Sequence, residues 1–139
     1  MKESENAAAP IAENPAPNLE SLQCKGQTKI NQGVIVSLKG QSLEWGKWGT
    51  DPATAMTGPS VANWMAQGRL ASSSGAEGRV IYKAADDATF TFYFDVPYSG
   101  TNKAQMSCDG KDCSLYDYSV SPVSPSGDVI SPVYTISKK

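Results

Sequence analysis

The run A-T-F-T-F-Y-F-D-V, residues 88–96, restricts the possible folds of this chain more than any other feature. Phe90, Phe92 and Phe94 alternate with polar or amphipathic side chains. Side chains two residues apart share one face of a β-strand, whereas a helix would distribute these rings around its axis. The stripe could form a ligand-binding surface, but such alternation is the ordinary way in which strands fill a sandwich core. The run therefore predicts a central strand with one buried aromatic face.

Shorter alternating runs recur along the chain, separated by clusters of Gly, Pro, Ser and Asp. Such spacing is typical of an all-β protein built from short strands and turns. The other strands are expected at residues 34–39, 43–45, 78–83, 116–120 and 133–137, with loops at 50–59 and 121–132. Residues 60–67 fit either a strand or a capped helix, because Val61, Trp64 and Met65 have helical spacing. We predict an antiparallel β-sandwich, with a barrel as the related alternative.

Residues 1–20 differ in composition from the rest of the chain. They are rich in Ala, Pro, Glu and Asn, and Pro10, Pro15 and Pro17 disfavour a long helix or a central strand. We expect a flexible acidic arm that folding does not require. Residues 21–139 then form a single domain, which is long enough to bury a core without the help of metals.

Composition excludes several classes of function. The chain has no histidine, which rules out a Ser/His/Asp triad, a Cys/His pair and a His-ligated zinc site. The formal net charge is −2 and the basic residues are scattered, so the concentrated basic face that nucleic acids need is missing. We predict a protein that needs no cofactor, binds no nucleic acid and is not an enzyme. A glycosidase-type pair of carboxylates is a weaker alternative, because no motif singles out two of them.

Cys108 and Cys113 bracket a short Asp-Gly-Lys-Asp turn. If strands pair across that turn, the two thiols come within disulfide distance. Two unrelated reduced thiols fit the sequence equally well, because connectivity cannot be deduced from spacing. Cys24 has no partner in either case.

Three aromatic residues lie beside turn residues. Trp45 and Trp48 belong to the run W-G-K-W, and Tyr98 belongs to P-Y-S-G. On one strand, residues three apart point to opposite faces, so at least one of the two indoles should lie outside the core. Tyr and Trp settle well where lipid meets water. These residues are candidates for surface recognition, with packing beneath a loop as the alternative.

Three segments together resemble the aegerolysin family. The run V-I-V-S-L-K-G-Q-S-L-E-W-G-K-W-G-T, residues 34–50, resembles its second strand and S-W-G-K segment. Residues 58–82 resemble its segment ending in G-R, followed by a Ser-rich turn and an E-G strand. The most specific run is T-F-Y-F-D-V-P-Y-S-G-T-N-K, residues 91–103, with its D-x-P-aromatic block. The resemblance covers residues 21–137 and is greatest to the small component of bacterial two-component insecticidal toxins.

The resemblance implies an antiparallel β-sandwich and assigns residues 60–67 to a strand. Aegerolysins bind membrane lipids, often sphingolipid headgroups, and many act with a larger protein that forms the pore. Fungal members have tryptophans where this chain has Phe94 and Tyr98, which favours the insecticidal branch. The matching positions, with Trp48 added as a neighbouring ring, give a candidate lipid-binding set of Trp45, Lys47, Trp48, Glu77, Phe94, Asp95 and Tyr98.

The expected function is the membrane-binding component of a two-component pore-forming toxin. Its expected partners are a target-cell lipid or surface receptor and a second, larger pore-forming protein, and a homo-oligomer on the membrane is an open alternative. No signal peptide and no membrane-spanning run is visible, so we expect a soluble protein, released without a visible signal, that acts at the target membrane. A carbohydrate-binding sandwich is the alternative, because aromatic platforms also stack on sugars.

Overall fold

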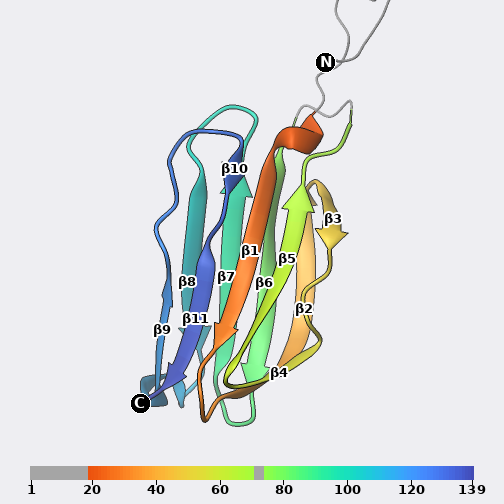
Figure 1. The fold of residues 1–139 in the computed structure, drawn as a ribbon. Coiled ribbons are helices and arrows are strands. Elements are labelled where there is room, and N and C mark those ends of the chain that lie inside the picture. Colours follow the sequence, from red (N-terminus) through yellow and green to blue (C-terminus); the bar gives the residue numbers. More distant parts are fainter. Residues whose placement is uncertain (1–18, 71–73) are drawn as a thin grey trace, which may run out of the picture.

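The structure, a computed structural model, describes residues 19–70 and 74–139 as two β-sheets packed face to face (Figure 1). One sheet has the strand order β3-β5-β1-β11-β9, with β10 paired to β1, and we call it the β1 sheet. The other has the order β4-β2-β6-β7-β8, and we call it the β7 sheet. The strands are β1 (Gln23–Ile30), β2 (Ile35–Trp45), β3 (Lys47–Thr50), β4 (Ala55–Thr57), β5 (Ser60–Gln67), β6 (Ala76–Ala84), β7 (Thr89–Val96), β8 (Lys103–Asp109), β9 (Tyr116–Val120), β10 (Val129–Ile130) and β11 (Val133–Lys138). The predicted all-β sandwich is confirmed.

Aromatic side chains from both sheets meet in the core. The three phenylalanines of β7 are fully buried, as their alternation predicts. Phe92 stacks on Tyr134 of β11, with ring centroids 4.4 Å apart and ring planes inclined by 5°. The Tyr134 hydroxyl donates a hydrogen bond of 2.7 Å to the Tyr93 carbonyl oxygen, so this buried polar group is satisfied. Ring stacking and this hydrogen bond join the centres of the two sheets.

The strand expected at residues 60–67 is confirmed as β5, and its Trp64 is buried in the core. An ideal Cβ on Gly26 of the neighbouring β1 would lie 2.2 Å from a Trp64 ring atom, so the indole occupies space that only glycine leaves open. Trp64 Nε1 donates a hydrogen bond of 3.1 Å to the Thr28 hydroxyl. These contacts fix Trp64 at the inner face of the β1 sheet.

One part of the topology departs from the predicted antiparallel arrangement. β1 pairs with β11 in parallel, with Gln27 opposite Val133 and Ile30 opposite Ile136. β10 also pairs in parallel with β1. The first and the last of the described strands are therefore hydrogen-bonded neighbours. Alternation within each strand cannot reveal such a pairing, because it depends on residues far apart in the sequence.

Several expected boundaries also change. The strands predicted at residues 34–39 and 43–45 are one strand, β2, which continues through Gly40 with an irregular register after Leu38. The loop predicted at residues 50–59 contains β4, and the loop predicted at 121–132 contains β10. A bulge accommodates an extra residue without ending a strand, which is why Gly40 does not interrupt β2.

Cys108 and Cys113 form a disulfide. The strands on either side of it do not pair across the turn, because β8 belongs to the β7 sheet and β9 to the β1 sheet. The bond closes the short segment in which the chain crosses between the sheets, with Cys113 beginning the 3-10 turn η2 (Cys113–Leu115). Cys24 is a free thiol in the core, and burial raises its pKa.

The described chain begins with the 3-10 turn η1 (Leu19–Ser21). Leu19 is only 3% exposed and belongs to the core, and Glu20 forms an ion pair with Lys47 of β3. The last two residues of the expected arm are therefore part of the folded domain. The rest of the arm, residues 1–18, lies outside the described residues.

Candidate functional site

One end of the sandwich is formed where the chain crosses between the sheets after β2, and by the turn that follows β7. Gly46 makes the crossing with φ of +105°, a conformation that other residues rarely adopt. An ideal Cβ at Gly46 would lie 2.5 Å from the Gln67 carbonyl oxygen. The crossing places Trp45 in the β7 sheet and Trp48 in the β1 sheet. We call this end of the molecule the tip.

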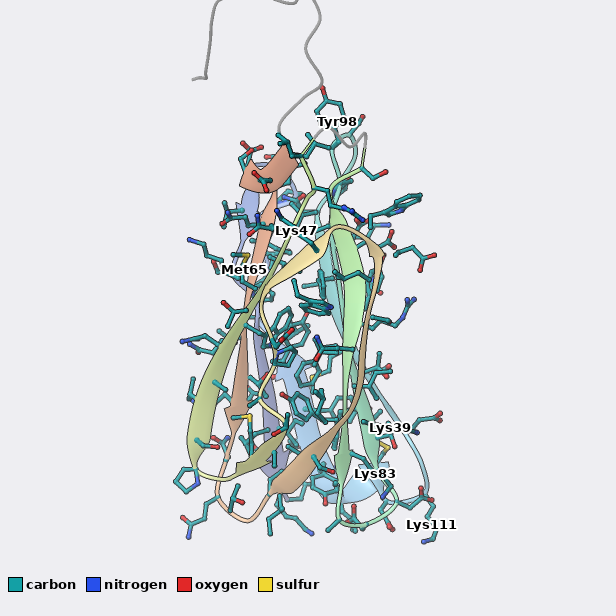
Figure 2. The ribbon with its side chains drawn as sticks, turned by 90° about the vertical axis from the view of Figure 1, so that its right-hand side faces the viewer. Lys39, Lys47, Met65, Lys83, Tyr98 and Lys111 are labelled. Carbon is teal, nitrogen blue, oxygen red and sulfur yellow. A yellow bond between two sulfur atoms is a disulfide. The ribbon has the colours of Figure 1, made fainter. Side chains whose placement is uncertain are left out.

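Two of the predicted aromatic residues are exposed at the tip. Trp45 is 53% exposed and Tyr98 is 59% exposed. Figure 2 shows Tyr98 at this end of the sandwich and Lys83 and Lys111 at the opposite end. Large aromatic rings held in water are typical of surfaces that bind a partner or an interface. Trp45 lies outside the core, as predicted for at least one of the two indoles of W-G-K-W, although the two rings lie on different strands and not on opposite faces of one strand.

Two carboxylates lie between these rings. The register places Trp45 opposite Glu77 of β6, Glu77 opposite Asp95 of β7, and Asp95 opposite Lys103 of β8. Trp45, Glu77, Asp95 and Tyr98 line one pocket of about 230 Å³, which we call the acidic pocket. The fold thus brings together four candidate residues that are far apart in the sequence.

The environment of the acidic pocket changes the titration of Asp95. Burial raises the pKa of Asp95 above its ordinary value, the Glu77 carboxylate raises it further, and Lys103 opposes the rise. Tyr93 Oη donates a hydrogen bond of 2.5 Å to Glu77 Oε2, and burial together with this bond raises the pKa of the phenol. A cation in the pocket would relieve the repulsion between the carboxylates. Carboxylates beside aromatic rings are also the groups that bind ammonium ions, so the pocket suits a cationic ligand.

The other three candidate residues do not line the acidic pocket. Phe94 is fully buried in the core, so its predicted role in direct lipid contact is wrong. Trp48 is half-buried and packs edge-on against Trp64 and Phe94, with ring centroids 6.2 and 6.1 Å apart. Lys47 lies on β3 and forms its ion pair with Glu20 of η1.

Sequence reasoning missed Tyr93 and Lys103, which both act on the carboxylates of the acidic pocket. Alternation along β7 does place Tyr93 and Asp95 on the outer face, opposite the buried phenylalanines. The missing information was the pairing of β7 with β6 and β8, because only that register brings Glu77 and Lys103 alongside.

Two further observations concern the part of the chain that the structure describes. In it, no three side chains of the His, Cys, Asp and Glu types come together in a way that could hold a metal ion. The same residues include no helix whose length and apolar character would suit a membrane span.

No protein-family model matches the chain, and no curated protein does. Three solved structures are similar to it. RahU protein, crystallised in complex with a TRIS molecule, has a TM-score of 0.71 and 17% identity, over 86% of this chain and 97% of that chain. The lipid binding protein Nakanori has a TM-score of 0.68 and 10% identity, over 88% of this chain and 72% of that chain. IP-1A from Alcaligenes faecalis has a TM-score of 0.72 and 20% identity, over 88% and 94% of the two chains.

At these identities the likeness shows the fold. The two-sheet β-sandwich expected from the sequence is therefore confirmed, and these three proteins share its fold.

Proposed function

We propose that this protein binds membranes through its tip, with the acidic pocket receiving the cationic part of a lipid headgroup. One observation carries the proposal: two exposed aromatic rings, Trp45 and Tyr98, flank the carboxylates of Glu77 and Asp95 at one end of the molecule. The rings are suited to the interface between lipid and water, and the carboxylates to an ammonium group. The description of Nakanori, which shares the fold, as a lipid binding protein supports the same reading.

The charge of the protein is consistent with this mode of binding. A formal net charge of −2 gives no general attraction to anionic lipids, so affinity has to come from the rings and from specific contacts in the pocket. Sphingolipids and other lipids with zwitterionic headgroups carry the ammonium that the acidic pocket suits. We therefore infer a preference for zwitterionic over anionic membranes.

Binding to vesicles tests this proposal. Wild type, Trp45→Ala and Tyr98→Ala are compared on vesicles of sphingomyelin and cholesterol and on vesicles of phosphatidylglycerol. Each substitution should weaken binding to the first by about tenfold or more, because burying an aromatic side chain contributes roughly 1.5–3 kcal/mol. Ile35→Ala is the matched control, since Ile35 is 58% exposed at the other end of β2. Equal losses in all three variants, or wild type that binds no zwitterionic vesicle, would refute the proposal.

We further propose that the chain is the membrane-binding component of a two-component pore-forming toxin, with insect cells as its target. The support is the aegerolysin resemblance of residues 21–137, whose motifs are most similar to the small component of insecticidal pairs. The larger protein would form the pore after the bound chain recruits it. In a dye-release assay, vesicles that bind the protein should keep their dye until that partner is added. Rapid release of the dye by this chain alone at low concentration would contradict the proposal that a second protein forms the pore.

A further inference from the structure

A second pocket lies beside the acidic pocket on the outer face of the β7 sheet. Arg79, Thr91, Tyr93, Gln105 and Ser107 line it, and its volume is about 300 Å³. The three strands β6, β7 and β8 contribute these side chains from their outer faces. We call it the basic pocket. The Tyr93–Glu77 hydrogen bond separates the two pockets, because Tyr93 lines one and Glu77 lines the other.

The basic pocket is rich in hydrogen-bond donors, and no carboxylate lines it. The Arg79 guanidinium lies over the Tyr93 ring, 5.0 Å from its centroid, and takes part in none of the ion pairs among the described residues. In that same part of the chain, no hydrogen bond engages the side chains of Gln105 or Ser107. A free guanidinium binds carboxylate, sulfate or phosphate, and the nearby amide and hydroxyl suit the hydroxyl groups of a sugar.

The position of the basic pocket limits what can reach it. Arg79 follows Glu77 by two residues on β6, so the two side chains share the outer face about 7 Å apart along the strand. The direction from Glu77 to Arg79 leads away from the tip. When Trp45 and Tyr98 contact a bilayer, the basic pocket therefore lies farther from the lipid than the acidic pocket does.

This order excludes the phosphate of an ordinary phospholipid as the ligand. That phosphate lies next to the lipid tails, on the inner side of the ammonium group. It would have to pass the acidic pocket to reach Arg79. An anion at the basic pocket must instead belong to the outer part of a long headgroup.

We propose that the basic pocket binds an acidic sugar, carboxylated or sulfated, on a membrane glycolipid whose bilayer is contacted by the tip. The proposal rests on the proposed membrane function. Arg79 pairs with the acid group of the sugar, and Gln105 and Ser107 bond its hydroxyl groups. Neutral glycolipids of the same length lack the group that Arg79 binds.

Two kinds of probe test this inference. Vesicles of phosphatidylcholine and cholesterol are prepared with a monosialylated glycolipid, with sulfatide, with the asialo counterpart, or with phosphatidylglycerol at the same charge density. Wild type should bind at least one acidic glycolipid better than both the asialo and the phosphatidylglycerol vesicles. Arg79→Gln should lose that preference, a decrease of about tenfold or more, as expected for one charge-assisted hydrogen bond. Binding to vesicles without glycolipid should not change.

Lys25→Gln is the matched control, because it removes the same charge from the outer face of the β1 sheet. An equal loss in Lys25→Gln, or an unchanged preference in Arg79→Gln, would overturn the proposal. Wild type that binds the vesicles but shows no preference for either acidic glycolipid would overturn it as well.

A soluble probe separates this inference from the proposed membrane function. Free sialyllactose should shift the backbone amide signals of Arg79, Tyr93 and Gln105 in NMR spectra, and lactose should not. Failure of the protein to bind any vesicle would refute the membrane function, while these shifts would still support the acidic-sugar site. Absence of the shifts, together with no preference among the vesicles, would overturn the inference alone.

Discussion

At the scale of single residues, Asp95 is held in the folded protein at an energetic cost. Burial and the neighbouring Glu77 raise its pKa in the folded state, so the ionised carboxyl is disfavoured relative to the unfolded chain. The Asp95 carboxyl therefore favours the folded state fully only at pH values below about 3.9, the pKa of Asp in the unfolded chain. This stabilisation is lost as the pH rises through the higher pKa that Asp95 has in the folded protein.

Asp95→Asn should therefore raise the free energy of unfolding at neutral pH, because the amide carries no charge to desolvate. The gain should shrink as the pH falls through the raised pKa of Asp95 and should be absent below the unfolded value of about 3.9. Urea unfolding of both proteins across this range measures the difference. Asp117→Asn, on the outer face of the β1 sheet, controls for the loss of a charge elsewhere. A gain that persists unchanged at acidic pH would show that the ionised carboxylate is not its source.

The tryptophans and tyrosines divide into rings that support the fold and rings that do not. Trp64 is buried, so Trp64→Ala should lower the free energy of unfolding by about 3–5 kcal/mol. Trp45→Ala and Tyr98→Ala should each change it by no more than about 0.5 kcal/mol, as is usual for exposed positions. Unfolding in urea measures all three. A large loss in either exposed variant would show that the ring stabilises the tip.

At the scale of the elements, the sequence was most informative where a strand has one buried face. The alternation of β7 predicted the burial of its phenylalanines, and the strand expected at residues 78–83 lies within β6. Pairing across distance was not predictable in this way, since the parallel contact of β1 with β11 joins opposite ends of the chain. The same limit applied to the candidate functional site. Its members could be proposed from motifs, but only strand register shows that Trp45, Glu77 and Asp95 lie side by side.

The crossing after β2 positions the acidic pocket, and Gly46 permits it. Two features disfavour alanine at position 46: the backbone has a positive φ, and the added Cβ would lie 2.5 Å from the Gln67 carbonyl oxygen. Gly127→Ala is a matched control, because Gly127 has the same φ of +105° with nothing within 4 Å of the added Cβ. Strain of this backbone type costs about 1–3 kcal/mol, so Gly127→Ala should lose an amount in that range. Gly46→Ala should lose more and should also weaken vesicle binding. Thermal unfolding and the vesicle assay measure the two effects, and equal stability losses would show that the carbonyl contact is unimportant.

At the scale of the whole molecule, the β1 sheet depends on the last strand of the chain. β11 lies between β1 and β9, and its Tyr134 and Ile136 are fully buried. Removing residues 133–139 should therefore abolish cooperative unfolding, although every strand of the β7 sheet remains. Near-ultraviolet circular dichroism and a thermal melt would show this. Removal of Lys139 alone is the control, and a cooperative melt within a few degrees of wild type after the longer truncation would contradict the dependence.

The parallel pairing of β1 and β11 also affects the order in which the strands can pair during synthesis. A ribosome releases β1 before any other of the described strands, but β11, the neighbour that completes its hydrogen bonds, is made after the other ten. Contacts between residues so far apart slow folding, and until they form, an unpaired strand edge is open to other chains. The hairpins of the β7 sheet, which carry both pockets, connect neighbours in the sequence and can pair while synthesis continues. The face that carries the two pockets can thus form before β1 is protected from pairing with other chains, and that protection arrives only when β11 has been made.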